Sequence, residues 1–186
     1  MTTSRRALPD DADGAASGAA ADVEIRPATR ADLLDVFRIE KAVFDQPWPF
    51  AAFEKALNAP AFLVADGRDA AVSVGADGVA AGDTLGYVIG DVTPNHGRDI
   101  GHVKDIAVRP DAQELGLGRR LLRESLRELT AAGAAVVKLE VRESNHRAQQ
   151  LYADEGFEPA RRIPRYYADG EPAFVMALDL EGWARR

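Results

Sequence analysis

The sequence contains no cysteine. Disulfide bonds, Cys-ligated zinc or iron–sulfur centres and a thiol nucleophile are therefore excluded. Histidine is also rare, with 3 among 186 residues, so we predict no metal site. Lysine occurs only at Lys41, Lys55, Lys104 and Lys138, and the other 19 basic residues are arginine. Because 30 acidic residues outnumber 23 basic ones, the net charge of −7 gives no overall attraction to nucleic acid or anionic lipid.

Long apolar runs are missing as well. No run approaches the ~18–20 residues that are needed to span a bilayer. Arg5-Arg6 suggests the start of a twin-arginine export signal, but Asp10, Asp11 and Asp13 interrupt the segment that would have to be apolar. We therefore expect a cytoplasmic protein, a monomer or weak dimer, that contacts neither membranes nor nucleic acid directly.

The composition favours one folded domain with short additions. Hydrophobic residues make up 46% of the chain and charged residues 28%, which suits a soluble protein with a single core. Residues 1–22 are rich in Ala, Gly, Asp and Ser, and we expect a disordered tail. The domain is predicted at 23–180, with a C-terminal tail at 181–186. Glycine and aspartate punctuate residues 67–83, which indicates a hairpin or surface insertion with a possible strand at 70–74.

The hydrophobic pattern predicts strands that alternate with helices, and hence a mixed α/β sheet. Thr29, followed three residues later by Asp32, is typical of a capping box at a helix start. The last two strands are expected to form a hairpin around 166–171. The predicted strands are 23–26, 61–65, 85–92, 103–108, 136–141, 157–162 and 174–180; the predicted helices are 29–43, 50–57, 116–132 and 145–154.

A glycine-containing turn follows the strand that ends at Val108. It reads Gln113-x-x-Gly116-x-Gly118 and opens a helix. The first N–H groups of a helix have no internal partner, and with the helix dipole they can bind phosphate oxygens. The Walker lysine is missing, and Leu121 stands where a dinucleotide fingerprint needs its third glycine. Taken alone, the turn is equally compatible with a tight strand-to-helix connection that binds nothing.

Further motifs carry a resemblance to a known family. The turn follows an Ile-Ala-Val strand, and together they resemble the acetyl-CoA motif of the GNAT acetyltransferase superfamily. Downstream segments are similar to its RimI branch and to archaeal and eukaryotic protein amino-terminal acetyltransferases. These segments are Gly101-His102, Leu139-Glu140-Val141-Arg142-Glu143-Ser144-Asn145, Leu151-Tyr152, Gly156-Phe157, Arg165-Tyr166-Tyr167-Ala168-Asp169-Gly170-Glu171 and Phe174-Val175-Met176-Ala177.

The resemblance covers about 23–180 and implies an α/β (α+β) GNAT fold, with a mixed, mostly antiparallel sheet of about seven strands flanked by about four helices. It implies acetyl transfer from acetyl-CoA to the α-amino group of protein N-termini, on ribosomal proteins or more broadly. The amine attacks directly, and the lack of cysteine agrees with a route that has no acetyl-enzyme. Two alternatives stay open: a GNAT enzyme acting on lysine side chains or small amines, and a non-catalytic acetyl-CoA-binding module.

The resemblance also implies the residues that bind acetyl-CoA. The glycine turn would hold the pyrophosphate, and the strand before it would pair with the pantetheine arm, although its side chains can equally be ordinary core. Family members often have a basic residue where this chain has Glu114, so some side-chain attraction is lost. The implied set is Ile106, Ala107, Val108, Gln113, Glu114, Leu115, Gly116, Leu117, Gly118, Arg119 and Asn145.

Asn145 and Tyr152 lie seven residues apart, which places both on one face of a helix. The resemblance assigns Asn145 to coenzyme contact and Tyr152 to the general acid that protonates the departing thiolate. A phenol pKa near 10 and a thiol pKa near 8.5 are close enough for proton transfer. Without the family, Asn145 is equally a helix N-cap and Tyr152 a half-buried core aromatic.

The resemblance makes Glu140 the general base, acting through water. A free Glu has a pKa near 4.3, so the hypothesis requires burial that raises the pKa. Period-2 alternation instead allows Glu140 to be an exposed strand residue beside Lys138. His102 is the rival base, because imidazole titrates near neutrality.

Three aromatic residues in predicted loops complete the site. In the family such loops flank the acceptor cleft, where tyrosine hydroxyls hold a peptide backbone. Tyr166, Tyr167 and Trp48 are therefore candidates for acceptor binding, with His102 beside them. The alternative for the loop aromatics is simple packing within the loops.

Overall fold

The computed structural model describes residues 23–67 and 84–185. The predicted tail at 1–22 and the possible strand at 70–74 lie outside these residues. Within the described part of the chain, no helix is long and apolar enough to cross a membrane.

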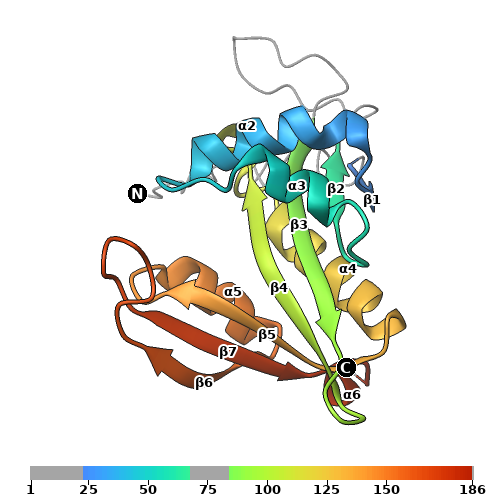
Figure 1. Cartoon of the computed structure of the whole chain (residues 1–186), viewed down its shortest axis with the longest axis vertical. Helices are drawn as coiled ribbons and strands as arrows, with labels where there is room; N and C mark the ends of the chain where they lie inside the picture. Colours follow the sequence, from blue (N-terminus) through green and yellow to red (C-terminus); the bar gives the residue numbers. More distant parts are fainter. Residues whose placement is uncertain (1–22, 68–83, 186) are drawn as a thin grey trace, which may run out of the picture.

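A seven-stranded sheet forms the centre of the molecule, in the order β1-β2-β3-β4-β5-β7-β6 (Figure 1). All neighbours run antiparallel except β4 and β5, which are parallel, so the predicted mixed and mostly antiparallel sheet is confirmed. The expected hairpin of the last two strands is confirmed by the pairing of β6 with β7. The strands are β1 Glu24–Pro27, β2 Leu63–Asp66, β3 Thr84–Thr93, β4 Asp99–Val108, β5 Ala134–Arg142, β6 Glu158–Ile163 and β7 Ala173–Asp179.

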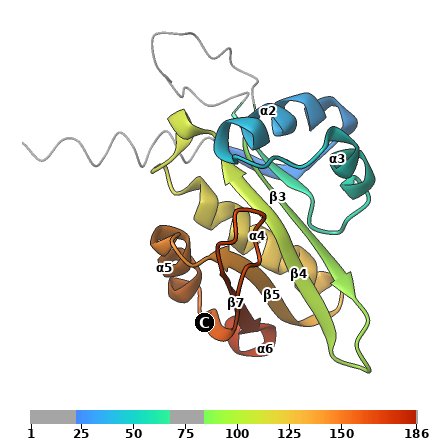
Figure 2. The same cartoon turned by 60° about the vertical axis from the view of Figure 1, so that its left-hand side comes forward.

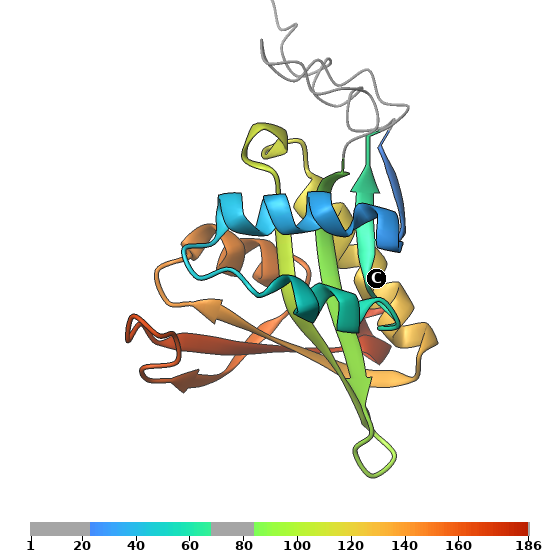
Figure 3. The same cartoon turned by 45° about the horizontal axis from the view of Figure 1, so that its top comes forward.

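Helices cover the sheet on both faces (Figures 1 and 3). On one face, α2 and α3 lie over β3 and β4 and bury a core around Val36, Phe53 and Tyr87. On the other face, α4 packs its leucine stripe, including Leu122 and Leu126, against the sheet, and α5 lies beside it. The described helices are η1 Arg30–Asp32, α2 Leu33–Val43, α3 Phe50–Ala56, η2 Pro110–Ala112, α4 Leu117–Ala131, α5 His146–Asp154 and α6 Leu180–Trp183.

Two helix ends follow the physical signals in the sequence, and one helix was not expected. The Asp32 carboxylate accepts hydrogen bonds from the backbone N–H and the hydroxyl of Thr29, both at 2.8 Å, which confirms the predicted capping box. Gly133 ends α4 with a φ of 95°, as a glycine after a helix can. The additional helix is α6, a single turn capped by the carboxylate of Asp179.

Two irregularities in β4 shape the site. Its pairing with β5 stops at Val103 opposite Leu139, and beyond this point the two strands diverge (Figure 2). A bulge between Ile89 and Gly90 of β3 leaves Lys104 without a partner residue in that ladder. The extra residue reverses the alternation of side chains, so Val103 packs on the α4 side while Ala107 packs on the α2 side.

Candidate active site

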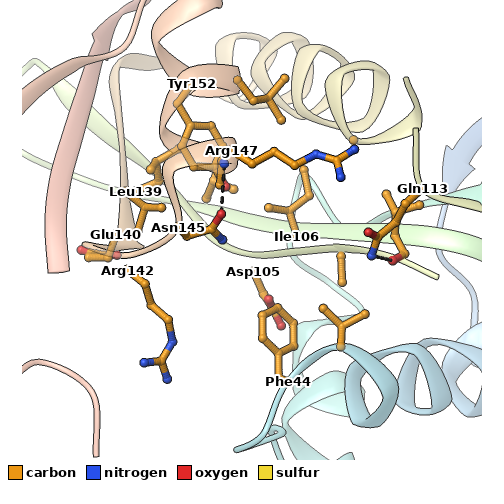
Figure 4. Close-up of a pocket in the computed structure, with 18 of the residues that line it drawn as sticks. Phe44, Asp105, Ile106, Gln113, Leu139, Glu140, Arg142, Asn145, Arg147 and Tyr152 are labelled. Carbon is orange, nitrogen blue, oxygen red and sulfur yellow. Dashed lines mark hydrogen bonds between the residues drawn. The ribbon is translucent and has the colours of Figure 1, made fainter. Parts of the chain in front are cut away.

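A cleft of about 1170 Å³ lies where β4 and β5 separate. Figure 4 shows its walls, which come from β4, β5, α5 and the segment after α2. It brings together nearly all the residues singled out in the sequence: Trp48, Ile106, Ala107, Val108, Gln113, Glu114, Gly116, Leu117, Gly118, Arg119, Glu140, Asn145, Tyr152, Tyr166 and Tyr167. Two others lie nearby: Leu115 packs against the core on the α4 side, and His102 contacts Glu140 from β4.

At one end of the cleft, the glycine turn presents backbone to the open space. Glu114 and Gly116 both have left-handed backbone, with φ values of 71° and 75°. A Cβ at Gly116 would meet nothing within 4 Å, so crowding does not require glycine there. The left-handed φ does, because side chains other than glycine rarely adopt it. The helix α4 starts at Leu117, so its first N–H groups lack intrahelical acceptors and border the cleft. This arrangement fits an anionic group such as a pyrophosphate.

The charges around the turn come from arginines on α4 and α5. The Arg119 guanidinium donates to Asp154 at 2.7 Å and to Glu155 at 3.0 Å, so its charge is already paired. Arg147, which the sequence analysis did not single out, lies 3.5 Å from the Glu114 carboxylate and lines the cleft. Arg147 therefore pairs with the acidic side chain at position 114 and offsets its charge.

The edge of β4 is open along the same cleft. Past Val103, no described strand pairs with β4 on the β5 side, so its backbone groups there can pair with an extended amide-containing arm. The Gln113 side chain donates to the Val108 carbonyl at 3.1 Å and fastens the turn to the strand end. An open strand edge that leads to a phosphate-binding turn fits the pantetheine and pyrophosphate of coenzyme A.

The helix α5 places Asn145 and Tyr152 on the cleft, as their spacing predicts (Figure 4). Asn145 is also the N-cap, since its side-chain oxygen accepts from the Ala148 N–H at 3.1 Å. Tyr152 is buried, with its ring 5.9 Å from that of Phe157. Burial, with the nearby charges of Asp105 and Tyr167, raises the pKa of Tyr152, so its phenol stays protonated.

Glu140 lies in an ion-pair environment that differs from the one expected. Its carboxylate is 2.6 Å from His102 Nε2 and 3.6 Å from Lys138 Nζ. Burial acts to raise the pKa of Glu140, but the hydrogen bond and charge of His102, with help from Lys138, outweigh it and lower the pKa. The expectation that the pKa of Glu140 lies above its ordinary value is therefore wrong.

A second carboxylate in the cleft, Asp105, was missed. Tyr87 Oη lies 2.9 Å from Asp105 Oδ2 and also hydrogen-bonds Glu40, whose other oxygen accepts from the Trp48 N–H at 2.6 Å. Burial, followed by the charge of Glu40, raises the pKa of Asp105 to about 7. The same burial and both carboxylates raise the pKa of Tyr87 far above its ordinary value. The signal for Asp105 was available: it is a lone acid in the apolar run that ends β4.

The other end of the cleft is aromatic. The Tyr166 and Tyr167 rings meet edge to face at 5.0 Å, and Tyr166 is 46% exposed. Arg142 stacks over the Tyr167 ring at 4.0 Å and donates to Asp169 and Glu171 at 2.8 and 2.6 Å. The loop between β6 and β7 is thus fastened to the end of β5.

Trp48 lines the cleft and also packs against a neighbouring aromatic residue. Its ring lies 6.0 Å from that of Phe53, while the residue lines the cleft. The functional and packing interpretations of Trp48 are therefore compatible.

Comparisons with known proteins show the family of this chain. The model of the acetyltransferase (GNAT) family matches residues 33–157. The chain is 37% identical to the N-alpha-acetyltransferase RimI of Mycobacterium tuberculosis over 84% of this chain and 92% of the relative. It is 31% identical to an N-alpha-acetyltransferase of Sulfolobus acidocaldarius, with the same coverage of both chains. The crystal structure of the ribosomal-protein-S18-alanine N-acetyltransferase of Escherichia coli superposes with a TM-score of 0.67 at 29% identity, over 85% of this chain and 94% of that one.

Proposed function

Since the chain belongs to the GNAT acetyltransferase family, we propose that it transfers the acetyl group of acetyl-CoA to the α-amino group at the N-terminus of proteins. One observation carries the proposal: a single cleft joins the glycine turn and open β4 edge to Glu140, Tyr152 and the paired tyrosines. The two relatives described above, both named as N-alpha-acetyltransferases, support this choice of acceptor.

The donor would lie along β4 and α4. The N–H groups at the start of α4 would hold the pyrophosphate, and the free edge over Ile106–Val108 would pair with the pantetheine arm. Asn145 and the small Ala148 leave room on the α5 side, and Arg147 adds positive charge there. Bound acetyl-CoA supplies an activated thioester; the remaining chemistry belongs to the side chains around it.

We assign Tyr152 and Glu140 distinct tasks. Tyr152 stays protonated at neutral pH and donates its proton to the departing thiolate. Glu140 is ionised at neutral pH, because His102 and Lys138 lower its pKa. A carboxylate of low pKa attracts an ammonium strongly but holds a transferred proton poorly. Glu140 therefore draws the acceptor's ammonium into the cleft, instead of the base role expected from the sequence.

The acceptor would enter from the aromatic end. The exposed Tyr166 and its partner Tyr167 can hydrogen-bond a peptide backbone, and Trp48 also lines the cleft. An α-amine has a pKa of about 7.7–8.0, against about 10.4 for lysine, so far more of it is neutral at pH 7. A site without a strong base would therefore favour α-amines.

The test is a thiol-release assay with acetyl-CoA and short peptides. The acceptors begin with free Ala, Ser, Thr, Met-Leu or Met-Glu, and N-terminally blocked lysine peptides and polyamines serve as controls. We expect turnover on free N-termini only. Coenzyme A binding is measured separately by calorimetry.

Each outcome has a defined meaning. Turnover only on lysine peptides or polyamines would place the protein with GNAT enzymes that acetylate other amines. Binding of coenzyme A with no turnover on any acceptor would support the non-catalytic alternative. In a true enzyme, Tyr152→Phe should abolish most turnover without weakening coenzyme A binding.

A further inference from the structure

Glu40 and Asp105 each place a carboxyl oxygen beside the hydroxyl of Tyr87, which can donate only one hydrogen bond. Tyr87 Oη is within hydrogen-bond distance of a carboxylate oxygen from each acid. A phenol has one proton, so it can donate to only one of the two. The second contact is a hydrogen bond only if that carboxyl carries a proton and donates it to the phenol oxygen. The geometry therefore describes two carboxyls that share one extra proton, as paired acids in other proteins do.

Both acids of this group border the cleft, and Asp105 is the less buried of the two. Glu40 is 1% exposed, and Tyr87 is fully buried, at 0%. Asp105 borders the cleft, and Figure 4 shows its side chain among the labelled residues of the wall. Its charge acts on the hydroxyl of Tyr152 across the cleft, whereas that of Glu140 acts on Tyr166 and Tyr167. Asp105 thus stands on the side of the proposed acid, and Glu140 on the side of the proposed acceptor entrance.

We infer that Asp105 is the proton acceptor for the incoming amine, and that Tyr87 and Glu40 are positioning residues that share the proton it receives. This inference rests on the proposed function. Glu140 binds the ammonium, and Asp105 deprotonates it. A base that accepts protons near neutral pH is well matched to an α-amine whose pKa is about 7.7–8.0.

The proton balance is complete without another reactant. One N–H bond of the ammonium breaks and an O–H bond forms on Asp105. The nitrogen lone pair then forms the C–N bond of the amide while the C–S bond of the thioester breaks. Tyr152 gives its proton to the sulfur and regains one from the nitrogen, and Asp105 releases its proton to water after the products leave.

The groups around Asp105 come from five elements. Glu40 of α2 raises its pKa, and Tyr87 of β3 lowers it through the hydrogen bond. Tyr152 of α5 and Glu140 of β5 border the same cleft. The Ile106 N–H of β4 also lowers the pKa of Asp105. Because burial and Glu40 dominate, the group stays partly protonated at neutral pH and can take and release a proton there.

The experiment compares Asp105→Asn with Glu140→Gln between pH 6 and pH 9.5, using an Ala-initiated peptide and acetyl-CoA. For Asp105→Asn we expect kcat/KM to fall by about 100-fold at pH 7, and by less than about 5-fold at pH 9.5, where the amine is already neutral. For Glu140→Gln we expect a higher KM for the peptide, and this increase should be as large at high pH as at pH 7. Asp91→Asn, an acid of β3 outside the cleft that pairs with Lys104, is the matched control and should leave the profile unchanged.

A second readout does not depend on turnover. When the pKa of a group is higher in the folded state than in the unfolded chain, the protein becomes less stable as pH rises from the unfolded pKa to the folded pKa. For Asp105 this range runs from about 4 to about 7. Asp105→Asn removes this loss. The difference in Tm between variant and wild type should therefore become more positive from pH 5 to pH 8. Asp105→Ser repeats the measurement if the amide does not fit.

Tyr87→Phe tests the positioning role. It removes a hydrogen bond that lowers the pKa of Asp105, so the acidic limb of the rate profile should move to higher pH while the alkaline rate is kept. A merely structural tyrosine would lower the rate equally at every pH.

Three results would overturn the inference. The first is rescue by high pH of the defect in Glu140→Gln but not of any defect in Asp105→Asn, which would make Glu140 the base. The second is an Asp105→Asn profile that matches wild type. The third is a Tm difference that stays constant with pH. If wild type acetylates none of the α-amine peptides, the proposed function fails, and the Tm series still decides whether Asp105 titrates near neutrality.

Discussion

Two carboxylates on neighbouring strands of one cleft have opposite environments. Glu140 on β5 pairs with His102 and Lys138, which keep it ionised. Asp105 on β4 faces the buried carboxyl of Glu40, and both burial and that neighbour favour its protonated form. The residue types are nearly equivalent, so the difference comes from what each strand faces. Pairs of acids whose environments push their pKa values apart are the pattern by which proteins give two carboxyl groups different roles.

The difference follows from the divergence of the sheet. Up to Val103, β4 and β5 are paired, and His102 can reach Glu140 across the ladder. Past that point β4 leaves β5, and its bulge turns Asp105 toward the α2 side, where Tyr87 and Glu40 are buried. On the β5 wall of the cleft, Glu140 is therefore paired with a basic neighbour. On the β4 wall, Asp105 faces a buried tyrosine and a second carboxyl group.

The largest effect is expected from Tyr152→Phe, which removes the acid that faces Asp105. We predict a fall in kcat of about 100-fold at every pH from 6 to 9, because Tyr152 is the proposed donor of the proton that the thiolate needs. Coenzyme A affinity should change less than about 2-fold. Tyr166→Phe is the matched control, since Tyr166 is exposed at the acceptor end, and it should alter KM for the peptide more than kcat. Equal losses in the two variants would contradict the assignment of Tyr152.

Asp32 is a third acid for the comparison, because its pKa is lowered and it does not line the cleft. The test is Asp32→Asn. Burial acts to raise the pKa of Asp32, but Arg26 and Thr29 lower it to about 2. We predict a loss of about 2 kcal/mol in the free energy of unfolding at pH 7, because a buried ion pair and the helix cap are both broken. Wild type should lose this advantage as pH falls from about 4 to about 2, which thermal melts at pH 7 and pH 3 can measure. Unchanged kcat would confirm that a depressed pKa alone does not mark a functional acid.

Arg142→Met would loosen the tyrosine loop beside Glu140 while leaving both Glu140 and Asp105 unchanged. Arg142 fastens the tyrosine loop through Asp169, Glu171 and the Tyr167 ring. We predict that KM for the peptide rises about 10-fold while kcat changes little, since each such contact is worth on the order of 1 kcal/mol. Arg162 lies on edge strand β6 and forms an exposed ion pair with Glu143. Arg162→Met breaks this pair and is the matched control. A comparable rise in KM for that control would mean that loop anchoring is not specific to Arg142.

The parts of the site that could be predicted from sequence are those set by local geometry. The glycine turn and the Asn145–Tyr152 pair each lie within a few residues, so chain periodicity places them. The carboxylate environments depend on contacts across 38 residues for His102 and Glu140 and 47 for Glu40 and Tyr87. The bulge between β3 and β4 could not be predicted either, because a bulge cannot be located without the partner strand. The direction of the Glu140 pKa shift was therefore missed, although its neighbour Lys138 was foreseen.

The smallest effect, from Lys138→Gln, sharpens the comparison because it weakens only one of the two groups that keep Glu140 ionised. Lys138 is 40% exposed, so solvent screens its charge, and we predict a loss of less than about 0.5 kcal/mol in stability at pH 7. A group whose pKa is lowered on folding stabilises the protein above its unfolded pKa, so this loss should disappear as pH falls below about 4. Removing a competing cation should also lower KM for the peptide ammonium by about 2-fold with kcat unchanged. Lys55→Gln, on α3, is the control for loss of a lysine elsewhere. A rise in KM for Lys138→Gln would show that Glu140 does not bind the ammonium, because the carboxylate would then have gained nothing from the loss of its competitor.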